Sequence, residues 1–138
     1  MQRISRVLFV AALLTVVAFA VMLNAQDKKT DQKSASLTGT LVDLACYAKG
    51  GYLTNNHGGM ENCGSMCATG GLPVALVDAN KKVHLLAVPS KGYADYVGME
   101  LRLTGMYGKH ASEVFLPEKL EVKENGKWVE KKLPKTMM

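Results

Sequence analysis

Three cysteines and one histidine are the residues of this sequence best suited to chemistry. Residues 57–71 read HGGMENCGSMCATGG, which brings His57, Cys63 and Cys67 close together, and Cys46 is the remaining cysteine of the 138-residue chain. Thiolate and imidazole are the ligands of tetrahedral zinc sites, and sulfur donors also favour Cu(I). The four side chains therefore predict a Cys3His site for a soft transition metal, Cu(I) or Zn(II).

The spacing of the later two cysteines bears on the choice between a metal and a disulfide. If residues 60–71 form a short helix that ends at its two glycines, Met60, Cys63 and Cys67 share one face. Residues four apart on a helix have Cβ atoms about 5–6 Å apart, whereas a disulfide needs about 3.5–4.5 Å. Two thiolates on one ion need sulfurs only about 4 Å apart. The spacing favours a metal, with Met60 as an additional candidate ligand.

Two alternatives stay open. Cysteines of exported proteins usually pair, and a bridge from Cys46 to Cys63 or Cys67 would close a loop of roughly 15–20 residues and stabilise the fold by about 3 kcal/mol. One thiol would remain, so this hypothesis describes a disulfide-stapled module that binds a peptide or glycan, as a monomer or thiol-linked dimer. A thiol redox protein is the third hypothesis, although the spacing is C-x3-C rather than C-x2-C.

Other polar residues carry weaker signals. Asp43 interrupts the apolar run LVDLAC and needs a partner, either backbone amides, a lysine or, as an outer-shell group of the metal site, His57. His84 is interpreted as an ordinary strand histidine and His110 as a solvated turn histidine. No phosphate loop, HExxH or C-x2-C-H motif is present. We therefore expect binding rather than catalysis, with neither nucleotide nor haem as cofactor.

The N-terminus is typical of an export signal. Arg3 and Arg6 precede an uncharged apolar run over residues 7–23, and the small Ala25 follows. This pattern predicts a protein that is exported to the periplasm or secreted. The run also has the length of an uncleaved membrane anchor, which needs about 20 apolar residues. The expected organisation is a signal peptide over 1–25, a flexible polar tether over 26–35 and one domain over 36–138.

The formal net charge is +5, or +3 without Arg3 and Arg6, and much of the remaining basic charge lies in the last twenty residues. Basic proteins often meet nucleic acid or acidic surfaces, but an exported protein rarely meets nucleic acid. We expect solvated lysines and no nucleic-acid partner, so the predicted partners are the metal ion or a protein that delivers it. The lysines concerned are Lys119, Lys123, Lys127, Lys131, Lys132 and Lys135.

The elements that must position the site are mainly strands. Short runs rich in Val, Leu and Thr alternate with glycine and asparagine turns from residue 37 onward, which is typical of β-structure. Asn125-Gly126 is a strong hairpin signal, and Pro117 is expected to end or bend a strand. The expected strands are 37–47, 73–79, 82–88, 100–108 and 112–116, followed by a hairpin over 120–132.

The order of these elements predicts a particular architecture. A long insertion separates the first two strands, and one or two helical turns over residues 90–98 separate the third and fourth. This order is that of a small five-stranded Greek-key barrel of the OB type. The insertion between the first and second strands is expected to be partly helical and to carry the cysteines and His57.

The same residues support a family resemblance. The segments GTLVDLACY, a glycine-rich stretch with His57, C-x3-C, GLPVALVD and LRLTGMYG together resemble a family of small exported bacterial proteins. The hallmark of that family is D-L-A-C-Y followed by H and C-x3-C, on an OB-like barrel, with no established activity. The resemblance covers about residues 36–122, and Met60 and Met66 lie outside its pattern. It implies one functional set, which is Asp43, Cys46, Tyr47, His57, Cys63 and Cys67.

Overall fold

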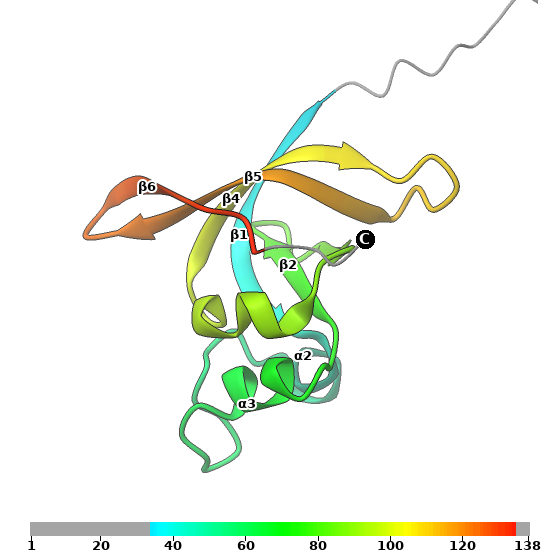
Figure 1. Ribbon diagram of the computed structural model, residues 1–138. Coiled ribbons are helices and arrows are strands. Elements are labelled where there is room, and N and C mark those ends of the chain that lie inside the picture. The colour runs from blue at the N-terminus through cyan, green and yellow to red at the C-terminus, as the bar shows by residue number, and fades with distance from the viewer. Residues whose placement is uncertain (1–33, 135–138) are drawn as a thin grey trace, which may run out of the picture. The chain divides into compact units, whose positions relative to one another are not determined.

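The computed structural model describes residues 34–134, which form a strongly bent sheet with short helices at one end (Figure 1). In chain order the elements are β1 (Ala35–Asp43), α2 (Leu44–Gly50), α3 (Cys63–Thr69), β2 (Val74–Asp78), β3 (Val83–Leu86), the 3-10 helix η1 (Ser90–Tyr96), β4 (Glu100–Tyr107), β5 (Val114–Glu124) and β6 (Lys127–Lys131). The predicted signal peptide and nearly all of the predicted tether lie outside the described residues. Within residues 34–134 no helix is long and apolar enough to cross a bilayer.

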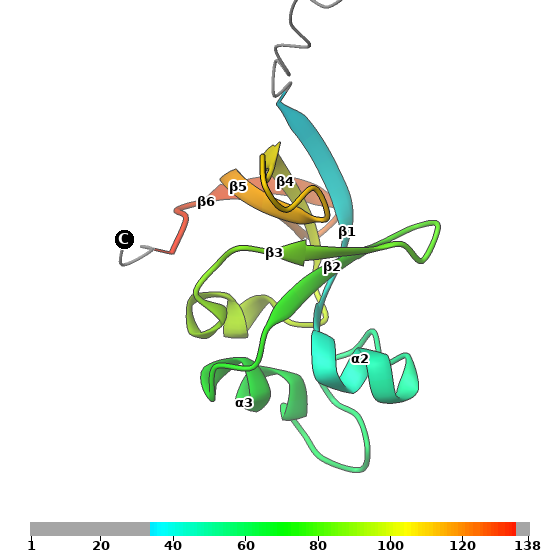
Figure 2. The same ribbon diagram turned by 90° about the vertical axis from the view of Figure 1, so that its right-hand side faces the viewer.

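Five of the six strands close into a ring. The sheet order is β3-β2-β1-β4-β5-β6, and these neighbours pair antiparallel. β3 and β5 also pair, in parallel, through Leu85 with Val114 and Leu86 with Phe115. Figure 2 shows β2 and β3 crossing below β4 and β5, with β6 extending the sheet beyond the ring. The predicted β-rich class is thereby confirmed.

Alternation along the strands separates the core from the outer surface. Leu101 and Leu103 of β4 are fully buried in the main core, which the buried Tyr93 of η1 also joins as predicted. On β1, Leu41 faces this core, whereas Val42 packs in a second cluster on the opposite face of the sheet. Because side chains alternate along a strand, Asp43 returns to the Leu41 side at the end of β1. That end is where the helices lie.

Two predicted strand boundaries are wrong. β1 starts at Ala35 and stops at Asp43 instead of spanning 37–47, because Asp43 caps a helix that begins at the next residue. The fifth strand does not end at Pro117, since β5 continues from Val114 to Glu124. The pairing register with β4 shifts next to Gly105, opposite Pro117. A shift of this kind accommodates a residue that has no N–H to donate to the ladder.

The C-terminal hairpin forms as predicted. Asn125 and Gly126 join β5 to β6 with φ angles of 50° and 77°, as a type I′ turn requires. Trp128 of β6 lies under the Arg102 guanidinium, which is 4.2 Å from its ring centroid. Three of the basic residues contact carboxylates across strands, namely Lys119 with Glu130 at 3.1 Å, Lys123 with Glu100 at 2.8 Å and Lys131 with Glu124 at 2.7 Å.

Candidate metal centre

The insertion that carries the cysteines spans residues 44–73 and is closed at its base. The Leu44 N–H donates to the Pro73 carbonyl at 3.0 Å, which ties the first residue after β1 to the residue before β2. Both views place α2 and α3 next to each other at the same end of the strand ring (Figures 1 and 2). The closed base keeps both helices at this end of the ring.

α2 positions the first cysteine. Asp43 is its N-cap, with Oδ1 accepting from the Ala45 N–H at 2.9 Å, and Gly51 ends it in the left-handed conformation. This arrangement leaves Cys46 in the first turn of a helix, rather than at the end of a strand as predicted. An aspartate at an N-cap satisfies backbone donors that otherwise have no partner. The predicted need of Asp43 for backbone amides is confirmed.

α3 positions the other two cysteines. It ends in a Schellman motif, because the Gly71 N–H donates to Ala68 O and the Leu72 N–H donates to Cys67 O. The predicted glycine cap is thus confirmed, but the helix begins at Cys63 and not at residue 60. Met60 therefore lies outside the helix and does not share a helical face with the cysteines.

Two small residues let α3 lie close to the core. Ala68 is fully buried in the main core, and Gly64 is buried beside Val97. A Cβ atom added to Gly64 would lie 2.6 Å from Val97 Cγ1 and 3.2 Å from Asn55 Oδ1. α3 therefore packs closely against η1 and the preceding loop. A larger residue at position 64 would increase the distance between them.

The three sulfur atoms converge. The Sγ atoms of Cys46, Cys63 and Cys67 all lie within 4.8 Å of one another, and all three thiols are free and partly buried. An ion with bonds of about 2.3 Å to each sulfur would need sulfurs about 4 Å apart. The observed cluster meets that requirement after a contraction of about 1 Å at most. The three cysteines could hold a metal ion.

The surroundings of Cys46 and Cys67 raise the pKa of both thiols and so favour their protonated forms. Hydrogen bonding of its thiol to the Asp43 carboxylate, followed by burial and by the negative charge of Asp43, raises the pKa of Cys46 to about 12. Burial, and then the same carboxylate, raise the pKa of Cys67. Asp43 is only 2% exposed. The site thus combines three soft sulfur donors with one buried carboxylate.

His57 does not belong to the group of ligand atoms within 4.8 Å of one another, and its ring lies next to Gly64 of α3. Its Nδ1 is 2.9 Å from Thr54 O, so Nδ1 carries the proton, because a carbonyl only accepts. The lone pair of a neutral imidazole is then on Nε2, which is buried and has no partner among the described residues. Thr54, and not Asp43, orients the ring. Tyr52 stacks on it with the ring centroids 4.8 Å apart.

Asparagine side chains hold the segment between the two helices. Asn55 Oδ1 accepts from the Ser65 N–H at 2.8 Å, and Asn56 Oδ1 accepts from the Asn62 N–H at 2.8 Å. The Gly64 N–H donates to Asn55 O at 3.0 Å. Sequence reasoning did not identify these residues, although the pair Asn55-Asn56 is a recognisable loop signal. Their bonds fix the segment that carries His57 against α3.

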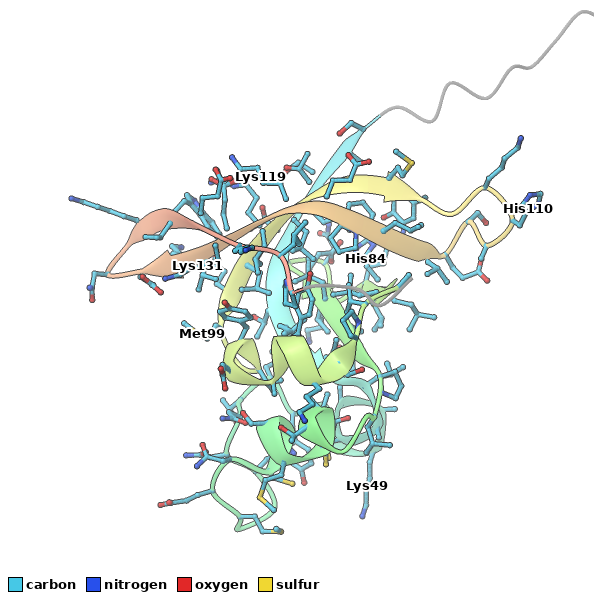
Figure 3. All side chains as sticks on the ribbon, viewed as in Figure 1. Lys49, His84, Met99, His110, Lys119 and Lys131 are labelled. Carbon is cyan, nitrogen blue, oxygen red and sulfur yellow. The ribbon has the colours of Figure 1, made fainter. Side chains whose placement is uncertain are left out.

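The other two histidines lie elsewhere. Figure 3 places His110 at the tip of the β4–β5 loop and His84 within the strand ring, both away from α2 and α3. His84 is 4% exposed and lies between Asp78 Oδ2, 3.1 Å from its Nε2, and the Tyr107 hydroxyl, 2.8 Å from its Nδ1. This strand histidine thus joins a buried hydrogen-bond network that the sequence did not reveal.

A cavity of about 530 Å³ lies beside α2, next to β1 and β2. Apolar atoms of Tyr47, Leu53 and Val77 and the charged side chains of Lys81 and Glu100 contribute to its lining. None of the three cysteines lines it. This cavity therefore does not belong to the sulfur cluster.

No protein-family model matches the chain, and neither a curated protein nor a solved structure matches it. The resemblance to a family with a D-L-A-C-Y and C-x3-C hallmark stays a prediction. The function is therefore argued from the geometry of the site.

Proposed function

We propose that this protein binds one soft transition metal ion, Cu(I) or Zn(II), through the thiolates of Cys46, Cys63 and Cys67. The single observation that carries the proposal is the convergence of three free sulfurs, from two helices, within 4.8 Å. Thiolates select such ions over Mg(II) or Ca(II), which prefer oxygen. Storage or delivery of the ion, or a metal that locks the insertion, are the roles in view; catalysis is not proposed.

We propose His57 as the fourth ligand. Metal-binding histidines usually donate their second ring N–H to a carbonyl or carboxylate, which fixes the tautomer. Here the Thr54 carbonyl accepts the Nδ1–H, so the Nε2 lone pair is buried and has no partner within residues 34–134. A buried polar atom without a partner costs free energy, which an ion would recover. Asp43 is proposed as an outer-shell carboxylate whose charge favours a cation.

Binding must remove protons from Cys46 and Cys67, because the raised pKa of each of these thiols favours its protonated form. Metal ligands of this kind bind as thiolates, so each sulfur that joins the ion releases its proton to solvent. The positive ion offsets the charge that builds up near Asp43. Because the pKa of Cys46 is raised, removing its proton requires free energy, and the metal–sulfur bonds must supply more than this amount.

We also propose a barrel topology and a cellular location for this protein. The five-stranded ring, its closure by β3 and β5 and the position of η1 between β3 and β4 support an OB-type Greek-key barrel. The basic and apolar N-terminus supports export to the periplasm or beyond. An exported metal site would receive its ion directly or from a delivery protein.

The test is metal stoichiometry with a thiol count. Full-length protein, kept reduced, is equilibrated with Cu(I) or Zn(II), separated from free ion and analysed for metal. We expect about one ion per chain for wild type. Cys63→Ser should weaken binding by more than the roughly 10- to 100-fold that loss of an outer-shell partner costs. His110→Ala, which changes an exposed histidine of the β4–β5 loop, is the matched control for His57→Ala.

A thiol count on protein purified without reductant separates the competing hypotheses. A chain without metal that has one free thiol under denaturing conditions would support the disulfide-stapled module and contradict metal binding. We expect weaker binding in His57→Ala than in His110→Ala, and equal binding in the two variants would exclude His57 as a ligand. Co(II) spectra distinguish three sulfur ligands from three sulfurs and one nitrogen.

A further inference from the structure

The four residues from His57 to Met60 form a tight turn. The His57 N–H donates to Met60 O at 3.2 Å and the Met60 N–H donates to His57 O at 3.1 Å. Gly58 and Gly59 between them have φ angles of 63° and 79°, which only glycine adopts readily. Residues directly opposite each other in such a pair project their side chains to the same side. The Met60 thioether therefore lies next to the His57 imidazole.

The two side chains differ in their access to solvent. Met60 is 52% exposed, whereas His57 Nε2 is buried. Both line a shallow pocket of about 210 Å³ together with Glu61. On the inner side, His57 Cε1 lies 3.5 Å from the position of a Cβ on Gly64, the neighbour of Cys63. Met60 and His57 thus place an exposed thioether and a buried imidazole nitrogen on the segment that precedes α3, the helix that carries Cys63 and Cys67.

The chemistry of these donors discriminates between ions. A thioether is a neutral, soft ligand that suits Cu(I), whereas Zn(II) is bound by thiolate, imidazole and carboxylate. Exposed apolar residues scattered singly need no explanation. Met60 differs from that case because a hydrogen-bonded turn with two glycines holds it beside an imidazole whose lone pair has no partner in the part of the chain that the structure describes.

We infer that Met60 is the entry ligand of a Cu(I) site, a deepening that rests on the proposed function. Cu(I) first binds Met60 Sδ and His57 Nε2, and its bonds to the molecule that delivers it break at the same time. The bond to Met60 then breaks as bonds to the cysteine sulfurs form, and each thiol that binds releases a proton to solvent. Copper stays in the +1 state throughout, so no oxidant or reductant takes part.

The test is the rate of Cu(I) uptake from a coloured bicinchoninate complex by reduced, full-length protein, followed by stopped-flow absorbance. Met60→Leu keeps the size and apolar character of the side chain and removes the sulfur. We expect it to slow uptake by about tenfold, equal to about 1.4 kcal/mol of activation free energy, and to leave one Cu(I) per chain at equilibrium. Met66→Leu, an equally exposed methionine of α3, is the matched control and should keep the wild-type rate.

Three results would overturn the inference. Met60→Leu could take up Cu(I) at the wild-type rate, Met66→Leu could be slowed equally, or Met60→Leu could slow Zn(II) uptake from a zinc chelator as much as Cu(I) uptake. A wild-type chain that binds Zn(II) but no Cu(I) would overturn the entry role and leave the proposed function standing. A wild-type chain that binds neither ion would overturn both.

Discussion

Asp43 has two roles. Its Oδ1 caps α2 by accepting from the Ala45 N–H. Hydrogen bonding to its carboxylate, followed by burial and by its negative charge, raises the pKa of Cys46 to about 12. The residue that builds the helix bearing Cys46 thus also favours the protonated form of that thiol.

Removing the charge of Asp43 should make Cys46 more reactive. Asp43→Asn keeps a good N-cap oxygen but removes the carboxylate that raises the pKa of Cys46 and Cys67. The pKa of both thiols should fall, and more thiolate should be present at a given pH. We expect faster alkylation of Cys46 by iodoacetamide at about pH 8, measured residue by residue by mass spectrometry on metal-free protein.

The comparison for this substitution is Asp95→Asn, which changes an exposed carboxylate of η1. It should leave the alkylation rates of all three cysteines unchanged. Equal or slower alkylation of Cys46 in Asp43→Asn would mean that the carboxylate does not hold the thiol protonated.

Gly64 sets the distance between α3 and the rest of the fold. A methyl group at this position would lie 2.6 Å from Val97 Cγ1 and 3.2 Å from Asn55 Oδ1, so α3 would have to move. We expect Gly64→Ala to lower the free energy of unfolding by about 1–3 kcal/mol, as overpacking does, and to weaken metal binding. Urea unfolding followed by circular dichroism measures the first effect.

Gly70→Ala is the matched control on the same helix. Gly70 has a helical φ of −71°, and an added Cβ would lie 3.4 Å from its nearest backbone oxygens. This variant should keep the wild-type free energy of unfolding or raise it by at most about 1 kcal/mol. If Gly64→Ala were as stable as Gly70→Ala, close packing of α3 would not be needed for the fold.

At the scale of elements, the sequence predicts correctly those strands, turns and helix ends that depend on local signals. Alternation of Leu101 and Leu103 locates β4, Asn125-Gly126 locates the last hairpin, and the glycines after Thr69 end α3. Each of these signals depends on backbone or side-chain geometry within a few residues. The closeness of the three cysteines was also expected, since only these residues and His57 offered a coherent ligand set.

The errors arise where two local signals compete or where partners are distant. The apolar run through Cys46 suggested a strand, but Asp43 as N-cap and Gly51 as C-cap, both visible in the sequence, determine a helix. His57 needed Thr54 O and the Gly58-Gly59 turn to be oriented. The partners of His84 lie 6 and 23 positions away, so no pattern around it could indicate them.

At the scale of the whole molecule, the Asp78–His84–Tyr107 network spans the closure of the ring. These residues belong to β2, β3 and β4, and the parallel β3–β5 junction that closes the ring has only two residue pairs. Asp78 uses both oxygens, because Oδ1 accepts from the Asn80 and Lys82 N–H groups and Oδ2 contacts His84. The carboxylate thus joins the β2–β3 turn to the interior of the ring.

The stability of the ring should therefore fall in acid through Asp78. Hydrogen bonding from His84, and then from the Lys82 N–H, lowers the pKa of Asp78 below its usual value. A carboxyl whose pKa is lower in the folded chain stabilises the fold above the unfolded pKa, about 3.9, and loses this contribution as the pH falls through the folded value. Urea midpoints should thus decrease below about pH 4, and less steeply in Asp78→Asn, which keeps an oxygen acceptor. Asp95→Asn should retain the full decrease, and an equal decrease in all three proteins would remove Asp78 from the explanation.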